Sequence, residues 1–326
     1  MGMDIILPGA LTTVQDLGRI GYQESGFTPS GVMDQKAGRT ANILVGNKES
    51  EAVLEMTLFG AKILFLSDNV IAVTGGNMEP RIEYEKVGRK SEVRQVPMYE
   101  AVSVHKGEML VFGMAVSGCR TYIACAGGLD IPIVMGSRST NLKCSLGGYR
   151  GRKLQSNDIV YFRNPVRVLS GMKKRKIKET VDNDAPETVI RVIPGPQEEY
   201  FTTGGTETFY SQSYVVSPEN DRMGMKLNGP KVEYKEQTDI ISDGIVFGSI
   251  QIPSGGAPII MMADHQTTGG YAKIGTVASV DLPKMAQSKA GDRIRFEKIA
   301  VGTGQRLCRR QAKELQKLAK ICGGTI

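Results

Sequence analysis

Short apolar runs, rich in β-branched residues, recur along the whole 326-residue chain between clusters of Gly, Asn, Asp and Pro. Runs of this length between turn-forming residues are typical of strands. The pattern predicts strands at 62–65, 70–74, 102–104, 109–112, 120–125, 159–162, 188–192, 214–216, 259–262 and 293–296. Helical patterns do not alternate with these runs, so we expect antiparallel barrels or sandwiches rather than βαβ units.

Helices are expected to be few. Residues 34–45 form one, with Asp34 as its N-cap and apolar residues spaced for a buried stripe. A short helix is predicted at 282–288, with Pro283 in its first turn. The clearest helix is 305–321, because its large apolar residues fall broadly on one face.

Three segments recur in the same order, which predicts a duplicated domain. Leu7–Gly9 matches Ile193–Gly195, Met56–Lys62 matches Met225–Lys231, and Asn157–Phe162 matches Gly291–Phe296. Pro8 would then correspond to Pro194, and Asp158 to Asp292. The alternative is a coincidence of common turn-and-strand patterns.

The charged stretch 170–187 has few large apolar residues and is predicted to be a linker. The expected organisation is a first domain at 1–169, this linker, a second domain at 188–300 and a basic C-terminal helix at 301–326.

Composition narrows the class of protein. Hydrophobic residues make up 40% of the chain, but no apolar run reaches the roughly 18 residues of a membrane helix, and no signal peptide is recognised. The net charge of +7 comes largely from the linker and the C-terminal segment, without Trp or interleaved aromatics, so nucleic-acid binding is not expected. The 5 cysteines form no CxxC pair and there are 2 histidines, which argues against a disulfide framework and a metal site and fits the cytoplasm.

Two polar segments are the first candidates for chemistry. Residues 12–19 contain Gln15, Asp16 and Arg19, which suit an anionic or amide substrate, although an Asp–Arg pair closing a turn is the simpler interpretation. Residues 264–273 place an acid, an imidazole, an amide, hydroxyls and an amine beside a Gly-Gly turn at the end of a strand. Functional groups often occupy such loops, and here we favour function.

Two further segments are weaker candidates. Residues 147–152, GGYRGR, could hold an anion on backbone N–H groups, although they are not a Walker A loop. Residues 218–224 again bring Asp and Arg, including Arg222, beside a glycine. A solvated turn is the alternative for both.

Seven separated motifs resemble one protein family over about residues 5–299. They are LTTVQDLGRIGYQ, SGVMDQKAGRTANILVGN, CRTYIACAGGLDIP with GSRST, GGYRGRKL, NDRMGMKLNGP, GSIQIPSGGAPIIMMADHQTTGGYAKIGTV and AGDRIRF. Together they are similar to the biotin-dependent carboxyltransferase/allophanate hydrolase subunit 2 family, which includes the KipA proteins and the C subunits of ATP-dependent 5-oxoprolinases. The resemblance implies a mainly β chain of two tandem cyclophilin-like β-barrel domains.

The same resemblance implies a role as the C subunit of a 5-oxoprolinase, which opens 5-oxo-L-proline to L-glutamate with ATP. Its expected partners are the other two components of that enzyme, one KipI-like and one LamB/YcsF-like, and the chain is not expected to act alone. One alternative is the carboxyltransferase component of a biotin-dependent urea or amide carboxylase. The absence of biotin-attachment, biotin carboxylase and amidase segments favours a separate subunit. Another is a KipA-type regulator that sequesters a KipI-like inhibitor of a histidine kinase.

The motifs carry a set of expected site residues. Asp16, Asp264, Tyr271 and Lys273 are expected in catalysis, and Gln15, Arg19, Arg222, Gln266 and Thr268 in substrate binding, with no metal. Arg19 and Lys273 are further expected to be exposed loop charges that face one cleft between the two barrels.

Overall fold

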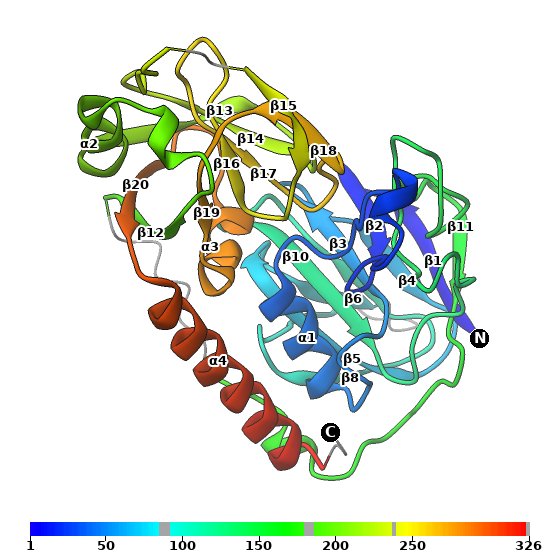
Figure 1. Ribbon diagram of the computed structural model, residues 1–326. Helices are drawn as coiled ribbons and strands as arrows, with labels where there is room; N and C mark the ends of the chain where they lie inside the picture. The colour runs from blue at the N-terminus through cyan, green and yellow to red at the C-terminus, as the bar shows by residue number, and fades with distance from the viewer. Residues whose placement is uncertain (85–91, 179–185, 237–238, 324–326) are drawn as a thin grey trace. The chain divides into compact units, whose positions relative to one another are not determined.

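The computed structural model describes residues 1–84, 92–178, 186–236 and 239–323. The chain divides into two compact units (Figure 1). The first comprises residues 1–19, 30–183 and 313–326, and the second comprises residues 20–29 and 184–312.

Two sheets form the framework of the first unit. One has the order β11-β1-β4-β9-β6-β7, and the other has the order β2-β3-β10-β5-β8. Neighbouring strands are antiparallel throughout both sheets. The strands are β1 Gly2–Leu7, β2 Leu11–Gln15, β3 Val53–Thr57, β4 Lys62–Phe65, β5 Asn69–Asn77, β6 Arg81–Tyr84, β7 Glu92–Gln95, β8 Ala101–Val104, β9 Met109–Val111, β10 Ser117–Cys125 and β11 Asp158–Tyr161.

The β2-β3-β10-β5-β8 sheet is buried on both faces. Along β10, Ile123 and Cys125 point into a core shared with the other sheet. Their neighbours Tyr122 and Ala124 point the opposite way, into a second core that contains helical residues. This alternation follows from the two-residue period of a strand, and it explains why β10 and β5 are buried almost without interruption.

Two helices cover the second core of this unit. α1 Gln35–Leu44 begins where the carboxylate of Asp34 accepts a hydrogen bond from the Ala37 backbone N–H, as expected of an N-cap. The long helix α4 Val301–Ile321 contributes Leu315, Leu318 and Ala319 from its last turns. The first unit is therefore built in three layers, sheet on sheet on helices.

A closed barrel forms the second unit, in the order β12-β19-β16-β17-β14-β13-β20. Its strands are β12 Thr188–Pro194, β13 Ser213–Asn220, β14 Gly224–Asn228, β16 Ser249–Gln251, β17 Ile259–Met261, β19 Lys273–Val277 and β20 Arg293–Lys298. A separate antiparallel pair is formed by β15 Asp239–Gly244 and β18 Thr268–Tyr271. Closure pairs both edges of the sheet and leaves a core filled by inward-facing side chains.

Short helices complete the second unit. α2 Thr203–Ser211 begins at Thr202, whose hydroxyl accepts from the Gly205 N–H, and its Phe209 stacks on Phe296 with ring centres 4.4 Å apart. α3 Leu282–Gln287 has proline in its first turn. Single 3-10 turns lie at Gln23–Ser25, Met172–Lys174, Glu198–Tyr200 and Ser279–Asp281.

The prediction of a mainly β chain with few helices is confirmed, and every strand predicted from sequence has a counterpart. The sequence pattern did not predict β1, β2, β3, β6, β7, β14, β15, β16, β18 and β19. Some of these, such as β15 and β18, are rich in glycine and polar residues, and α2, which was also missed, contains two glycines in its first turn. A closed barrel is present in the second unit. In the first unit the described strands form two separate sheets instead.

The predicted domain boundaries differ from the observed division in three places. Residues 20–29, expected in the first domain, belong to the second unit. The stretch 170–187, expected to be a linker, is part of the first unit as far as the structure describes it up to residue 178, and residues 179–185 lie outside the described residues. Backbone hydrogen bonds join Arg175 to Ala101 and Ile177 to Tyr99, so this segment extends the sheet edge at β8. The predicted C-terminal helix is likewise divided, because its last turns bury apolar residues in the first unit.

The two copies of the proposed duplication have equivalent turns before Asp158 and Asp292, but their strands pair differently. The carboxylates of Asp158 and Asp292 each accept a hydrogen bond from the backbone N–H three residues earlier, and the preceding Asn157 and Gly291 both have positive φ, 69° and 93°. However, β1 and β11 run antiparallel, whereas the matched strands β12 and β20 run parallel. The repeat therefore marks equivalent turns, and a full superposition of two barrels stays a prediction.

We predict that the end of α4 contributes to the stability of the first unit. Leu315→Ala should lower the free energy of unfolding by about 2–4 kcal/mol, because it removes a buried leucine and leaves a cavity. Gln316→Ala is the matched control on the exposed side of the same turn and should change it by less than about 0.5 kcal/mol. Chemical denaturation followed by circular dichroism measures both. Equal effects would show that the last turns of α4 do not pack as described.

Candidate functional site

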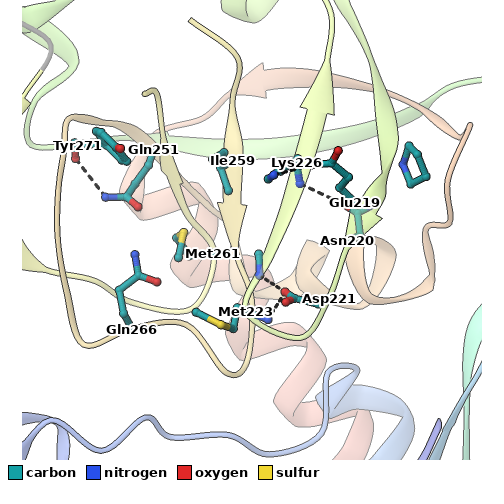
Figure 2. A pocket seen from close by; sticks show the side chains of 12 residues that line it. Glu219, Asn220, Asp221, Met223, Lys226, Gln251, Ile259, Met261, Gln266 and Tyr271 are labelled. Atoms are coloured by element: carbon teal, nitrogen blue, oxygen red, sulfur yellow. Dashed lines mark hydrogen bonds and ion pairs between the residues drawn. The ribbon is translucent and has the colours of Figure 1, made fainter. Parts of the chain in front are cut away.

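A cavity of about 560 Å³ opens beside the barrel of the second unit (Figure 2). The β13–β14 hairpin, the strands β16 and β17, and the loop leading into β18 supply its walls. The lining residues are Pro218, Glu219, Asn220, Asp221, Met223, Gly224, Lys226, Gln251, Ile259, Met261, Gln266 and Tyr271. Of the residues expected from sequence, Gln266 and Tyr271 belong to this lining.

Neutral hydrogen-bonding groups gather at one side of the cavity. Figure 2 shows Gln251, Gln266 and Tyr271 on the same side of Met261. Gln251 is 2% exposed, and its Nε2 donates to the Tyr271 carbonyl oxygen at 3.2 Å, which fixes the orientation of its carboxamide. A carboxamide has two donors and an acceptor, so this side suits a ligand that contains an amide or ureido group.

Charged groups lie at the opposite side, beyond Ile259 (Figure 2). Lys226 Nζ is 2.6 Å from Glu219 Oε2, and this contact raises the pKa of Lys226 and lowers that of Glu219. Both side chains are exposed, so the pair contributes little to stability and can open to admit another anion. Asp221 is held differently, since its Oδ1 accepts from the backbone N–H groups of Met223 and Gly224.

A buried ion pair joins two walls of the cavity. Arg222 and Asp264 are 5% and 7% exposed, and two hydrogen bonds connect them, from Nε to Oδ2 at 2.9 Å and from Nη2 to Oδ1 at 3.2 Å. The backbone reinforces the link, because the Asp264 N–H donates to the Arg222 carbonyl oxygen. Sequence analysis expected Arg222 to bind substrate and Asp264 to act in catalysis. Their mutual bidentate contact favours instead a role in holding the hairpin and the loop together.

His265 follows Asp264 in the same loop and is 2% exposed. Its Nδ1 lies 2.7 Å from the Gln266 carbonyl oxygen, which can only accept, so Nδ1 carries the proton. Burial lowers the pKa of His265 below its ordinary 6.5, although the hydrogen bond and the Asp264 charge act in the opposite direction. The imidazole is thus a neutral group that orients the backbone beside Gln266.

Lys273 and Thr268 lie at the β15–β18 pair. Lys273 is 4% exposed, and its Nζ forms an ion pair with Asp243 and donates to the Gly244 carbonyl oxygen at 3.0 Å. The contact with Lys273 lowers the pKa of Asp243. Lys273 is therefore not the exposed loop charge that was expected, since its ammonium holds β15 in place. Thr268 is exposed on β18 and is not among the cavity residues.

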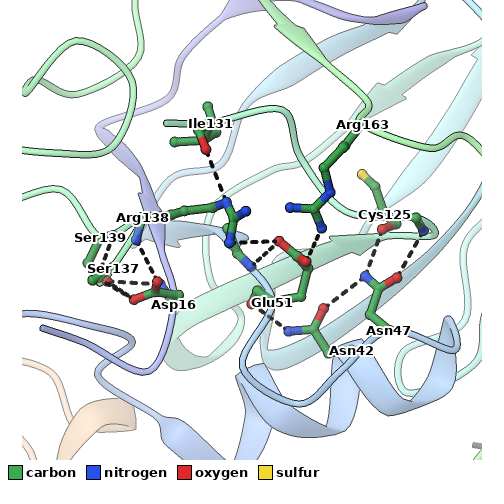
Figure 3. A network of polar contacts seen from close by, with 12 residues as sticks. Asp16, Asn42, Asn47, Glu51, Cys125, Ile131, Ser137, Arg138, Ser139 and Arg163 are labelled. Atoms are coloured by element: carbon green, nitrogen blue, oxygen red, sulfur yellow. Dashed lines mark hydrogen bonds and ion pairs between the residues drawn. The ribbon is translucent and has the colours of Figure 1, made fainter. Parts of the chain in front are cut away.

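The three residues expected from the first unit are also buried. Figure 3 shows Asp16 beside Ser137, Arg138 and Ser139. Its carboxylate accepts from both serine hydroxyls at 2.6 Å, and from the Arg138 N–H at 2.6 Å. These contacts engage the Asp16 carboxylate within the fold rather than leaving it for a ligand.

Arg19 and Gln15 serve the same part of the first unit. Arg19 is 0% exposed and donates to the carbonyl oxygens of Val134 and Ser139 at 3.2 and 3.0 Å, so it too is not the exposed charge that was expected. Gln15 bridges the Thr140 carbonyl oxygen and the Gly31 N–H. These residues lie in the first unit and Lys273 in the second, and the shared cleft stays a prediction.

Several cavity residues were not recognised in the sequence. Gln251 and Lys226 come from strands, where a polar residue is most simply explained as solvent-facing, and Glu219 lies in the candidate segment 218–224 but was not singled out. The signal for Gln251 was a polar residue at a buried position between two isoleucines. Within the described residues, no three His, Cys, Asp or Glu side chains are grouped to hold a metal ion.

Of the two ligands implied by the resemblance, biotin matches the lining of this cavity better than ATP does. Its charged lining has one ammonium group, on Lys226, against two carboxylates, on Glu219 and Asp221. That balance opposes a triphosphate, so no step with ATP is assigned to the cavity. A ureido ring would match the carboxamides of Gln251 and Gln266.

Comparison with known proteins places this architecture in a family. Residues 25–298 match the carboxyltransferase domain, subdomain A and B, and the chain belongs to this family. The chain is 33% identical over 317 residues to the 5-oxoprolinase C subunit of Escherichia coli, covering 97% of each protein. It is 32% identical to the 5-oxoprolinase C subunit of Haemophilus influenzae, covering 98% of each.

Larger proteins contain a similar part. The chain is 30% identical to the urea amidolyase of Saccharomyces cerevisiae over 99% of its own length but 18% of that protein. The crystal structure of the Kluyveromyces lactis urea amidolyase superposes with a TM-score of 0.87 and 30% identity, covering 97% of this chain and 20% of that one. The K. lactis urea carboxylase structure gives 0.86, covering 97% and 29%.

We predict that the buried ion pair is required for a stable second unit. Asp264→Asn leaves the Arg222 cation buried without its counter-charge and should cost about 3–5 kcal/mol in the free energy of unfolding. Replacing both partners with apolar residues, Arg222→Met with Asp264→Leu, should recover part of that loss. Glu219→Gln at the exposed pair is the control and should leave the unfolding midpoint unchanged. A midpoint for Asp264→Asn equal to wild type would contradict the burial of the pair.

We also predict a pH dependence that originates at His265. The pKa of His265 is lowered in the folded state, so the unfolded chain takes up a proton more readily than the folded chain. The contribution of neutral His265 to stability is therefore fully present above about pH 6.5 and is lost as the pH falls below that value. His265→Gln should flatten the plot of unfolding midpoint against pH between about pH 7 and pH 5. His105→Gln, at an exposed histidine, should retain the wild-type slope. Parallel slopes for all three proteins would exclude His265 as the origin.

Proposed function

We propose that this chain is the C subunit of an ATP-dependent 5-oxoprolinase. One observation carries the proposal: the similarity to two bacterial 5-oxoprolinase C subunits extends over nearly the whole of both chains. The urea amidolyases, by contrast, match along a small share of their length. The assembly would include a KipI-like component and a LamB/YcsF-like component, act in the cytoplasm, and convert 5-oxo-L-proline and water to L-glutamate while ATP is consumed.

The cavity supports this proposal because its two sides complement the two polar groups of 5-oxoproline. The lactam presents one N–H and one carbonyl oxygen, which the carboxamides of Gln251 and Gln266 can satisfy together. The substrate carboxylate would take the place of Glu219 beside Lys226. Ile259 and Met261 lie between these sides and would contact the ring methylenes.

The residues expected from sequence take distinct roles in this proposal. Gln266 and the phenol of Tyr271 would bind the substrate, with Thr268 at the start of the strand that carries Tyr271. Arg222 and Asp264 would hold the cavity open, and Lys273 would position β15. Gln15, Asp16 and Arg19 would maintain the corresponding polar loops of the first unit.

The chemistry explains why partners would be needed. A lactam is a poor electrophile, so its carbonyl carbon must be activated before water adds and the C–N bond breaks, leaving a carboxylate and an amine. Neither Asp16 nor Asp264 lines the cavity, and donors within the fold hold both, so this chain places neither carboxylate where a general base would act. The activation with ATP therefore falls to the assembled complex.

A biotin-dependent carboxyltransferase is the second candidate, favoured by the family and by the structural similarity to K. lactis urea carboxylase. In that case the paired carboxamides would face the ureido ring of carboxybiotin, carried by a partner. The two functions differ in a simple requirement, since the first needs no biotinylated protein. Genes for the KipI-like and LamB/YcsF-like components beside this one would favour the 5-oxoprolinase, and a biotin carboxylase gene would favour the alternative.

We predict that the isolated chain opens no 5-oxoproline, and that adding the KipI-like and LamB/YcsF-like components yields ATP-dependent release of glutamate. Release of glutamate is measured by a coupled assay, with each protein omitted in turn. Turnover by this chain alone would contradict its role as one part of a complex. A complete mixture that is active only with a biotinylated partner and bicarbonate would support the carboxyltransferase instead.

Within that complex, we predict different kinetic effects at the two sides of the cavity. Gln266→Leu should lower kcat/KM by about 10- to 100-fold, because a group that binds the lactam is lost. Lys226→Gln should raise KM with little change in kcat, as expected when a remote binding contact is removed. Lys231→Gln, at an exposed lysine outside the lining, is the control. Wild-type kinetics for both cavity variants would show that the substrate binds elsewhere.

A further inference from the structure

A second cavity, of about 440 Å³, lies wholly within the first unit and has no role in the function proposed above. Three segments supply its walls: the loop around 130–134, the glycine turn at 147–151 and the exposed face of β11. Besides the glycine turn, its lining includes Asp130, Ile131, Val134, Ile159 and Tyr161. The glycine turn is the GGYRGR segment that the sequence marked as a possible anion site.

The buried polar residues of the first unit hold one wall of this cavity. Arg19 binds the Val134 carbonyl oxygen, and the Arg138 Nε donates to the Ile131 carbonyl oxygen at 3.0 Å. Asp16 in turn accepts from the Arg138 backbone N–H (Figure 3). The backbone carbonyl groups of Val134 and Ile131 are therefore held by two arginines that are fully or mostly buried. This makes the wall a preorganised surface.

The glycine turn is fitted against the same framework. Gly147 has φ 66°, and a Cβ there would lie 2.3 Å from the Ser139 carbonyl oxygen and 2.6 Å from Arg19 Nη2. At Gly148 a Cβ would lie 1.8 Å from Thr140 Oγ1. A side chain at either position would displace the turn, so the close approach requires glycine here.

The turn presents Arg150 to the cavity. Arg150 has φ 57°, is exposed, and its guanidinium carbon lies 5.4 Å from the centre of the Tyr149 ring. Its neighbour Arg152 is engaged elsewhere, in a two-bond pair with Asp158 at 2.6 and 2.8 Å. Arg150 is thus the guanidinium of this turn that remains for a ligand.

Two opposite charges line the cavity without neutralising each other. Within the described ranges, neither Arg150 nor Asp130 forms an ion pair with another side chain. The lining also contains the apolar or aromatic side chains of Ile131, Ile159 and Tyr161. A small molecule that fits all three features carries a carboxylate, an ammonium group and an apolar body.

We infer that this cavity binds a free α-amino acid with an apolar side chain. Arg150 would receive the α-carboxylate in a forked contact, and Asp130 the α-ammonium group. The apolar side chain would lie against Ile159 and Tyr161. The inference does not depend on the proposed function, because it concerns a different unit and a different cavity.

The test uses the isolated full-length chain and isothermal titration calorimetry. L-Leucine and L-proline are the first probes, and 4-methylpentanoate and 3-methylbutylamine are leucine analogues that lack one charge each. We expect an amino acid to bind in the millimolar range, and each analogue to bind at least about tenfold more weakly, since tenfold in Kd corresponds to about 1.4 kcal/mol. Equal binding of leucine and either analogue would overturn the inference.

Two variants assign the binding to this cavity. Arg150→Gln and Asp130→Asn should each raise the Kd at least about tenfold while leaving the circular dichroism spectrum unchanged. Arg309→Gln, at an exposed arginine of α4 outside the cavity, is the matched control and should bind as wild type. Unaltered binding by both variants, or no binding of any of the standard amino acids at about 20 mM, would refute the assignment.

Discussion

The buried ion pair between Arg222 and Asp264 is the constraint on which the cavity of the second unit depends. Two charges held almost entirely away from water are tolerated only when each satisfies the other, so the hairpin that carries Arg222 and the loop that carries Asp264 are joined. Residues on either side of the pair line the cavity: Asp221 and Met223 beside Arg222, and Gln266 shortly after Asp264. The buried ion pair thus determines the positions of the accessible residues that line the cavity.

The first unit uses the same arrangement with a different set of residues. Asp16 accepts from hydroxyl and backbone donors, among them the Arg138 N–H, and the Arg138 side chain donates to the Ile131 carbonyl oxygen (Figure 3). Arg19 donates to the Val134 carbonyl oxygen in the same loop. Arg138 and Arg163 also contact Glu51, which ties this loop to the segment that follows α1. The charged residues that the sequence marked as candidates for catalysis or binding form buried framework contacts here. The accessible polar groups beside them were not all recognised in the sequence.

A buried charged framework beside accessible cavity groups is compatible with what is known of the family to which the chain belongs. Its similarity extends over nearly the whole length of two 5-oxoprolinase C subunits, but over only a fraction of the urea amidolyases. In the two functions proposed above, the same pair of carboxamides would face either a lactam or a ureido group, with the same framework around them. The surrounding partners would then decide the reaction, which is why the proposed activity belongs to a complex.

The sequence by itself determined the mainly β architecture, because strand period and turn residues are local properties. It also determined helix starts such as Asp34, whose capping role needs only the next three residues. Which group each polar side chain contacts was decided by the tertiary structure alone. Lys273 was expected to meet a ligand and meets Asp243, thirty residues earlier in the chain, while Asp16 meets serines more than a hundred residues away. No local pattern distinguishes a charge that will be buried against such a distant partner from one that will face a cavity, since the electrostatic cost of burial is set by which groups the fold brings together.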